Sequence, residues 1–272
     1  MEEGRIIGFI SIKGGVGKTT TVANLAQTLS EDFNKKVLIV DANFSAPCIP
    51  MHYGFLEWKN TLHDVLNNKA SIKEAVYQYS ESLHILPSGF HGEKNTAFLK
   101  LKQHLVTLKH YYDLILIDTT PALNKELLAA MNASDELFIV TTPDHPTLSC
   151  TMHAIKLAKI KKIHITGMIL NQVLGKKYEL NIETLEDHTQ TPIVSVLFKD
   201  KKIPKSISKT IPLTKLYPKS KTAINFKKLA SAIIKENFED PSFINKIKSR
   251  FSKKVERDKI NRVIMNHHLS LR

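Results

Sequence analysis

Apolar residues in this chain follow two alternating patterns. Short continuous apolar runs, typical of strands buried on both faces of a sheet, occur at residues 6–12, 37–41, 83–86, 114–118, 137–141, 165–170 and 193–197. Segments with apolar residues at helical spacing lie between them, at residues 18–30, 61–66, 72–77, 99–109, 127–131, 148–160, 182–186 and 223–234. Strands that alternate with helices predict an α/β fold with a doubly wound, mostly parallel sheet flanked by helices.

Polar residues close several of the predicted strands. Asp41, Asp118 and Asn171 each stand at the end of an apolar run, and a glycine-rich loop follows the first run. In open α/β sheets, ligands bind outside the carboxyl ends of the strands. The sequence therefore predicts a ligand site at this edge of the sheet.

The loop after the first strand has the sequence Lys13-Gly14-Gly15-Val16-Gly17-Lys18-Thr19-Thr20. Its glycines let the backbone bring N–H groups close to an anion, and the helix that starts near Lys18 adds the positive end of its dipole. In a phosphate-binding loop, Lys18 reaches the β and γ phosphates and Thr19 ligates Mg²⁺. The alternative is a turn without a ligand, but the strand–loop–helix context favours phosphate binding.

The start of this loop departs from the common string GxxxxGK[ST], because Ile12 stands where the first glycine is expected. With its additional Lys13, the string KGGVGKTT resembles the deviant phosphate loop of the MinD/ParA family of ATPases. The resemblance implies a P-loop NTPase fold and cofactors ATP and Mg²⁺. It implies nucleotide contacts from Gly14, Gly15, Val16, Gly17, Lys18, Thr19 and Thr20. It also implies an ATP-dependent homodimer in which Lys13 reaches the nucleotide of the other subunit; a solvated loop lysine is the alternative.

The two strand-end aspartates are the predicted partners of the metal. Asp118 ends a strongly apolar run in the manner of a Walker B aspartate, which holds Mg²⁺ through water. A carboxylate that caps the next turn is the alternative. By resemblance to the family, Asp41 also lies near the metal. The predicted metal ligands are therefore Thr19, Asp41 and Asp118.

The second strand ends in Asp41-Ala42-Asn43, where the MinD/ParA family generally has D-x-D with a second carboxylate that orients the attacking water. An amide at Asn43 can hold a water by hydrogen bonds but cannot accept a proton. The catalytic residues expected from the resemblance are Lys13, Lys18, Asp41 and Asn43. We expect an ATP hydrolase with slow turnover.

Two further regions resemble the part of the family's site that holds the base. Asn171 matches the position from which family members contact the adenine, with a turn-forming asparagine as the alternative. Residues 203–212, with a proline near each end, resemble the segment that flanks the base. Asn24, on the helix after the loop, is a candidate for positioning the switch residues or a filler of the core.

Composition limits the class of protein. Cys48 and Cys150 form no CxxC motif, which argues against a disulfide framework and against an iron–sulfur carrier. No apolar run approaches the roughly 20 residues of a membrane span, and the acidic start does not resemble a signal peptide. We expect one ATPase domain at residues 1–237, a tail at residues 238–272, and a cytoplasmic location.

The basic charge is concentrated in the second half of the chain. Residues 1–150 carry a net charge of −3, whereas residues 151–272 carry +16, within a total of +13. In the tail, a helix starting at Asp240 and Pro241 would place Phe243, Ile247 and Phe251 on an apolar face beside basic residues. Such a helix resembles the membrane-targeting helix of MinD proteins. DNA binding and a protein-contact or solvated helix are the alternatives.

These observations favour a MinD-like switch. Its ATP-dependent dimer would bind the anionic inner face of the cell membrane, recruit an unidentified protein partner and act in the positioning of division sites or polar machinery. A ParA-like partitioning ATPase that binds DNA, and a nucleotide-binding adaptor with slow or no hydrolysis, are the alternatives.

Overall fold

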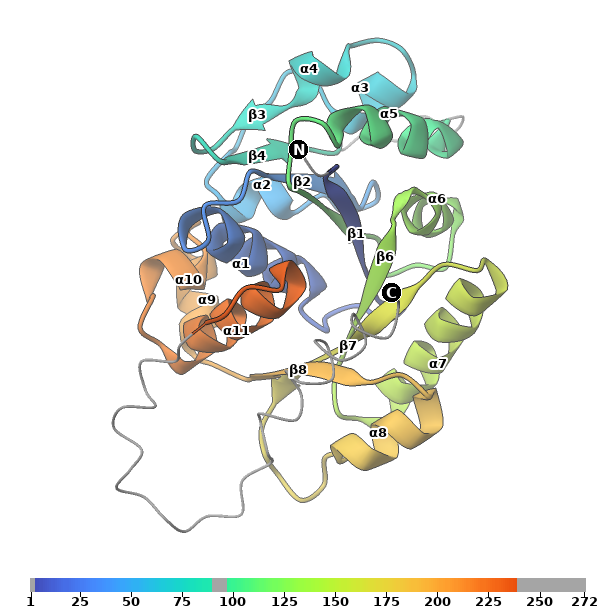
Figure 1. Cartoon of the computed structure of the whole chain (residues 1–272), viewed down its shortest axis with the longest axis vertical. Coiled ribbons are helices and arrows are strands. Elements are labelled where there is room, and N and C mark those ends of the chain that lie inside the picture. Colours follow the sequence, from blue (N-terminus) through green and yellow to red (C-terminus); the bar gives the residue numbers. More distant parts are fainter. Residues whose placement is uncertain (1–2, 90–96, 239–272) are drawn as a thin grey trace.

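A sheet of eight strands forms the centre of the computed structural model, which describes residues 3–89 and 97–238 (Figure 1). The strands are β1 (Arg5–Ile10), β2 (Val37–Ala42), β3 (Tyr77–Gln78), β4 (Leu83–Leu86), β5 (Leu114–Thr119), β6 (Glu136–Thr141), β7 (Ile165–Val173) and β8 (Ile193–Phe198). Their order is β3-β4-β2-β5-β1-β6-β7-β8. Every neighbouring pair is parallel except β3 and β4. The predicted doubly wound, mostly parallel sheet is confirmed.

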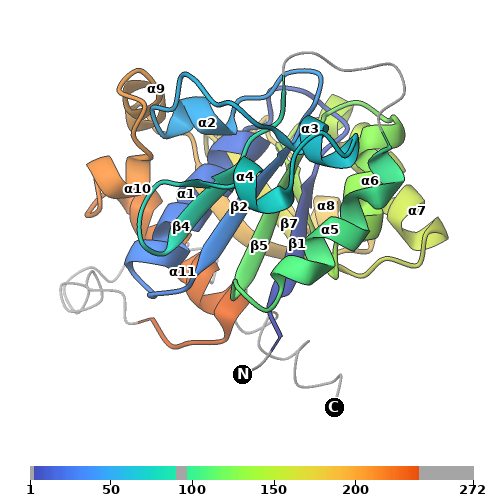
Figure 2. The ribbon, with the colours of Figure 1, turned by 90° about the horizontal axis from the view of Figure 1, so that it is seen from above.

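Helices cover both faces of the sheet (Figures 1 and 2). One face is covered by α1 (Lys18–Glu31) and α11 (Lys221–Ile234), which pack against each other. The other face is covered by α3 (Leu62–Leu66), α5 (Leu101–Leu108), α6 (Lys125–Ala133), α7 (His145–Ile160) and α8 (Ile182–Thr189). Short helical elements complete the described chain: α2 (Ile49–His52), α4 (Ile72–Ala75), η1 (Phe98–Lys100), α9 (Lys202–Ile207) and α10 (Leu213–Leu216).

The central strand β1 explains the continuous apolar run at the start of the chain. Ile7 and Phe9 belong to the core cluster that contains α1, whereas Ile6 and Ile10 belong to the clusters beneath the opposite helices. The ring of Phe9 stacks on that of Phe138 at 5.7 Å between centroids. Because both faces of β1 are covered, the strand needs apolar side chains on both sides. This packing fixes the loop that follows β1.

Three short regions of the chain differ from the expectation. Residues 77–78 form a strand rather than the end of a helix, because Val76 is extended and Tyr77 pairs with Ile85 of β4. Residues 49–52, for which no helix was expected, form α2, and a carboxylate of β2 accepts the backbone hydrogen bonds at its start. The third difference is α9 and α10, which fill a region where no helix was expected.

The expected tail, residues 238–272, lies outside the described residues apart from Phe238, whose ring makes an edge contact with Phe33 at 6.3 Å. The amphipathic helix expected from Asp240 onward is thus a prediction only. Within residues 3–89 and 97–238, no helix combines the length and the apolar character needed to cross a membrane.

Candidate active site

The glycine-rich loop joins β1 to α1 and lies at the carboxyl edge of the sheet. Gly15 and Gly17 have φ angles of +79° and +85°, a left-handed conformation that favours glycine. Gly17 is the residue before α1, and its carbonyl accepts the first helical hydrogen bond from Thr21 N at 2.9 Å. A side chain added at Gly14 or Gly15 would meet no other atom within 4 Å. The loop therefore presents open backbone beside the positive end of a 14-residue helix.

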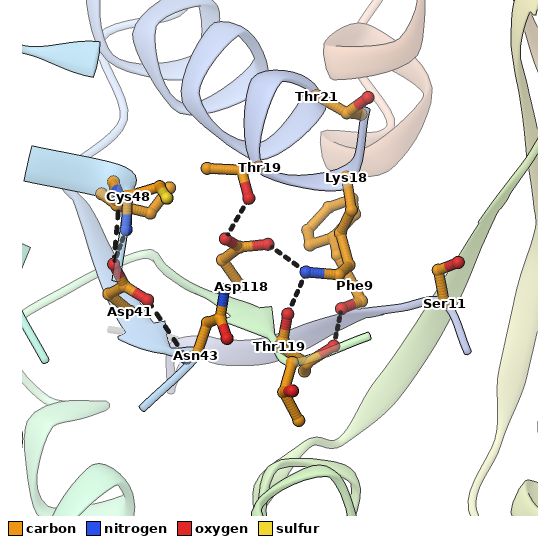
Figure 3. A network of polar contacts seen from close by, with 12 residues as sticks. Phe9, Ser11, Lys18, Thr19, Thr21, Asp41, Asn43, Cys48, Asp118 and Thr119 are labelled. Carbon is orange, nitrogen blue, oxygen red and sulfur yellow. Dashed lines mark hydrogen bonds and ion pairs between the residues drawn. The ribbon is translucent and has the colours of Figure 1, made fainter. Parts of the chain in front are cut away.

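Lys18, Thr19 and Asp118 lie in contact with one another (Figure 3). Lys18 Nζ lies 2.8 Å from Asp118 Oδ1 and also donates to the carbonyl of Thr119, and both charged groups are buried. Thr19 Oγ1 donates to Asp118 Oδ2 at 2.6 Å. Thr119 in turn donates from its hydroxyl to the Phe9 carbonyl at 2.8 Å, which ties β5 to β1. The cluster contains a hydroxyl and a carboxylate, which are the hard oxygen ligands that suit Mg²⁺. Its lysine stands where the loop ends and α1 begins.

Asp41 lies directly across from Asp118 in the register of β2 and β5 and is fully buried. Its carboxylate accepts backbone hydrogen bonds from Asn43 at 3.1 Å, Cys48 at 2.9 Å and Ile49 at 3.0 Å. Burial raises the pKa of Asp41 to about 7, and the nearby Asp118 adds to the rise, while the three N–H donors oppose it. Asp41 thus fixes the path of the chain between β2 and α2, a contribution that no local sequence signal indicates.

Asn43 follows β2 and is buried, with 7% of its surface exposed. Its Nδ2 donates to the Ala46 carbonyl at 2.7 Å, and its Oδ1 has no hydrogen-bond partner among the described residues. Buried polar atoms without a partner are uncommon and carry a desolvation cost. The side chain also lines the cavity beside the loop. The buried Oδ1 of Asn43 is therefore an acceptor without a partner close to this cavity.

Lys13 makes its contacts within its own chain. Its Nζ lies 3.1 Å from Asp144 Oδ1 and 2.7 Å from Thr147 Oγ1, at the start of α7. Burial favours the neutral form of Asp144, but hydrogen bonds from Thr142, Thr147 and Lys13 outweigh it and lower its pKa to about 2. Sequence reasoning missed Asp144, although its position before His145-Pro146 after an apolar run is a helix N-cap signal.

Asn171 and Gln172, at the end of β7, hold the loop from the side. Asn171 Nδ2 donates to the Val16 carbonyl at 2.7 Å, and Gln172 Nε2 donates to the Gly15 carbonyl at 2.6 Å. A side chain at Gly17 would come within 2.3 Å of Asn171 Nδ2. The structure thus brings the predicted Asn171 to the loop and adds Gln172, which sequence reasoning did not single out.

A cavity of about 480 Å³ extends from the loop toward α9. Its polar end is lined by residues 13–21 together with Asn43, and Asn171 lines it beside the loop. Its apolar side is formed by Leu197, Phe198, Ile203, Pro204, Ile207 and Phe226. The sequence pointed only to the stretch 203–212, because the other apolar residues come from β8 and α11 and share no local motif. The cavity thus combines a polar end that contains lysines with an apolar side, which suits a ligand that carries both anionic and apolar groups.

Comparisons with known proteins agree with this arrangement. A family model described as an AAA domain matches residues 4–174. An uncharacterised ATP-binding protein of Methanocaldococcus jannaschii is 32% identical over 257 residues, which cover 91% of this chain and 97% of that protein. The structure of the cell division ATPase MinD of Pyrococcus furiosus is similar, with a TM-score of 0.80 and 33% identity over 85% of this chain and 99% of that one.

A second solved structure is that of the septum site-determining protein MinD of Pyrococcus horikoshii complexed with Mg-ADP. It is similar to this chain with a TM-score of 0.80 and 32% identity, covering 91% of this chain and 100% of that one. The deviant loop, the strand-end aspartates and these similarities lead to one conclusion. The chain belongs to the MinD/ParA family of P-loop ATPases.

Proposed function

We propose that this protein is a MinD-like molecular switch that binds Mg-ATP, dimerises with ATP at the interface and acts in the spatial positioning of cellular machinery. One observation carries the proposal: the Lys18–Asp118–Thr19 cluster stands at the polar end of a cavity whose far side is apolar. A MinD of similar fold has been solved with Mg-ADP, which supports ATP and Mg²⁺ as the cofactors.

The residues of the loop would each contact a different part of the bound Mg-ATP. Backbone N–H groups of residues 14–20 would surround the phosphates, and Lys18 would turn from Asp118 toward the β and γ phosphates. Thr19 would ligate Mg²⁺ through its hydroxyl, with Asp118 and Asp41 nearby. The metal supplies charge neutralisation for phosphoryl transfer to water. Asn171 would lie beside the adenine end of the nucleotide.

Asn43 is the residue on which the rate of hydrolysis depends. Its Oδ1 is buried without a partner, and a turn of the side chain would bring it to the cavity, where it would accept a hydrogen of a water and orient that water toward the γ phosphate. Because an amide cannot take the proton, we propose slow turnover and a long-lived ATP state. The amide of Asn43 also supports a further candidate function, that of a nucleotide-binding adaptor that hydrolyses little ATP.

Dimerisation requires Lys13 to exchange its partners. In the described chain it contacts Asp144 and Thr147, and both charged side chains are partly exposed, at 37% and 42%. An exposed ion pair is worth about 0–1 kcal/mol, so a phosphate of a second subunit would compete well for this lysine. This exchange would link ATP binding to assembly.

The basic tail is the proposed membrane contact, and lysines of the described chain favour DNA as the second candidate. Lys201, Lys202, Lys205 and Lys209 are exposed just before, on and just after α9, with Asp200 as the acidic neighbour. A cluster of this kind attracts polyanions. Membrane binding is the preferred function because the tail combines basic residues with apolar ones.

Cosedimentation separates these functions. The full chain and a variant ending at residue 238 are mixed with phosphatidylglycerol vesicles, phosphatidylcholine vesicles or a random 60-base-pair duplex, each with ATP or ADP. We expect ATP-dependent binding to phosphatidylglycerol vesicles alone, lost in the shortened variant. Binding to the duplex in both variants would instead establish the ParA-like alternative, and no binding to either surface would contradict both.

A further inference from the structure

Asn24 makes a buried connection between the helix after the phosphate loop and the wall of the cavity. It lies on α1 with 1% of its surface exposed, and it is not among the residues that line the cavity. Its Nδ2 donates to the Thr20 carbonyl at 2.8 Å, and its Oδ1 accepts from Thr214 N at 3.0 Å. Thr214 Oγ1 also donates to the Asn24 carbonyl, at 3.3 Å. The side chain of Asn24 thus joins two elements that are 190 residues apart.

The backbone N–H of Thr214 would have no hydrogen-bond partner without Asn24. Thr214 lies in the first turn of α10, where backbone N–H groups have no partner within the helix. Pro212, the residue before α10, makes no side-chain capping bond. Thr214 is 4% exposed, so water is a poor substitute for Asn24 Oδ1. Asn24 therefore acts as the cap of a helix remote in sequence.

The segment that Asn24 holds, α9 and α10, contains residues of the apolar side of the cavity, which we call the wall. Ile203, Pro204 and Ile207 of α9 line the cavity, and α9 packs on α10. The turn between them is fixed by a hydrogen bond from Ile211 N to the Ser206 carbonyl at 3.2 Å. A shift of α10 would consequently move the wall relative to the phosphate loop.

Helix α1 is the common reference for both ends of the cavity. Lys18 and Thr19 stand in its first turn, and Asn24 stands six residues after Lys18, a rise of about 9 Å. We propose that Asn24 is a positioning residue that fixes the base-side wall relative to the phosphate loop and thereby sets the affinity for the base of the nucleotide. This inference rests on the proposed nucleotide-binding function and deepens it, because it assigns selectivity for the base to a residue that does not touch the nucleotide.

The test is the variant Asn24→Leu, which keeps the shape of the side chain and removes the acceptor for Thr214 N. Its control is Thr28→Val, which removes the 2.9 Å hydrogen bond from the Thr28 hydroxyl to the Asn24 carbonyl within the same helix and keeps the side-chain bond between Asn24 and Thr214 N. Calorimetry measures the affinity of each variant for Mg-ADP, Mg-GDP and Mg-pyrophosphate. Pyrophosphate contacts only the phosphate end and reports on the loop alone.

We expect Asn24→Leu to bind ADP about tenfold more weakly, to lose discrimination between ADP and GDP, and to keep pyrophosphate affinity within about twofold. Thr28→Val should bind all three ligands like the native protein. Equal losses for ADP and pyrophosphate, or no change in the ADP-to-GDP ratio, would overturn the inference. If Asn24→Leu does not fold, Thr214→Val, which removes only the hydroxyl bond, must show a smaller loss of the same ratio. A native protein that binds neither ADP nor pyrophosphate would contradict the proposed function instead.

Discussion

Gly17 meets two requirements of the loop at once, a left-handed backbone and space for a neighbouring side chain. Its φ of +85° lies in the left-handed region, and its missing side chain leaves room for Asn171 Nδ2. The loop carbonyl of Val16 is held by the same Asn171 amide. One methyl group at this position would therefore strain the backbone and displace the side chain that fastens the loop.

We predict that Gly17→Ala weakens Mg-ATP binding at least tenfold, because the loop cannot keep both its conformation and its contact with Asn171. Fluorescence titration with a labelled ATP analogue measures the loss. Gly175→Ala is the matched control, since its φ is also positive, at +71°, and an added side chain would meet nothing within 4 Å. That control should lose a little stability and keep its affinity. Equal affinities for the two variants would count against this role of Gly17.

A second residue-scale prediction concerns Asn43. Asn43→Asp restores a carboxylate at the predicted water-positioning site and should raise the single-turnover rate of ATP hydrolysis at least tenfold, since positioned proton acceptors accelerate such steps. Rapid quench with radiolabelled ATP measures the rate. Asn43→Ala, which loses the amide, should be slower than the native protein. If native and Asn43→Asp rates are equal, the amide does not limit turnover.

Sequence reasoning is most direct for the candidate site residues that belong to one contiguous motif. Residues 13–20 can be identified from the sequence because the residues that form a phosphate loop follow one another in the chain. It did not predict the hydrogen bonds that Asp41 accepts from Cys48 N and Ile49 N, or the one that Gln172 donates to the Gly15 carbonyl. These contacts depend on where distant segments meet, which the local pattern does not encode.

The region around β4 and β5 provides a test at the scale of elements. On β4, His84 Nδ1 lies 2.7 Å from the hydroxyl of Tyr112, which precedes β5. Burial lowers the pKa of His84 below its ordinary value of 6.5, and the charge of Lys36 adds to the effect. The unfolded chain therefore takes up a proton at a pH where the folded chain does not. Stability contributed at this site is present above pH 6.5 and is lost as the pH falls below it.

We predict that His84→Asn reduces the loss of thermal stability between pH 7 and pH 5, even if its melting temperature at pH 7 is lower. Scanning calorimetry across this range measures the slope. His110→Asn, at an exposed histidine, is the control and should keep the native slope. An unchanged slope in His84→Asn would show that His84 does not couple folding to protonation.

At this scale, the sequence indicated long elements better than short ones. β1, β2 and β5 were predicted because continuous apolar runs are required in strands covered on both faces. In contrast, α2 and α10 are short, and side chains of other elements, Asp41 and Asn24, bind their first N–H groups. No cap signal within their own sequence marks their start.

For the whole molecule, the central claim is that ATP turns two separate chains into a dimer. The described chain contains the loop, the cavity and Lys13, which is held by an ion pair that costs little to exchange. A nucleotide held by slow hydrolysis would keep the dimer long enough to bind a surface. The claim therefore predicts assembly that depends on the γ phosphate and on Lys13.

Light scattering after size exclusion tests this claim most directly, with the full chain in Mg²⁺ and either ATP or ADP. We predict a mass close to the 30.8 kDa of one chain with ADP and twice that mass with ATP. Lys13→Ala should bind ATP and stay at one chain, whereas Lys161→Ala, at an exposed lysine of the α7 terminus, should dimerise like the native protein. A mass of one chain in ATP, or a dimer that forms equally with ADP or with Lys13→Ala, would contradict the account.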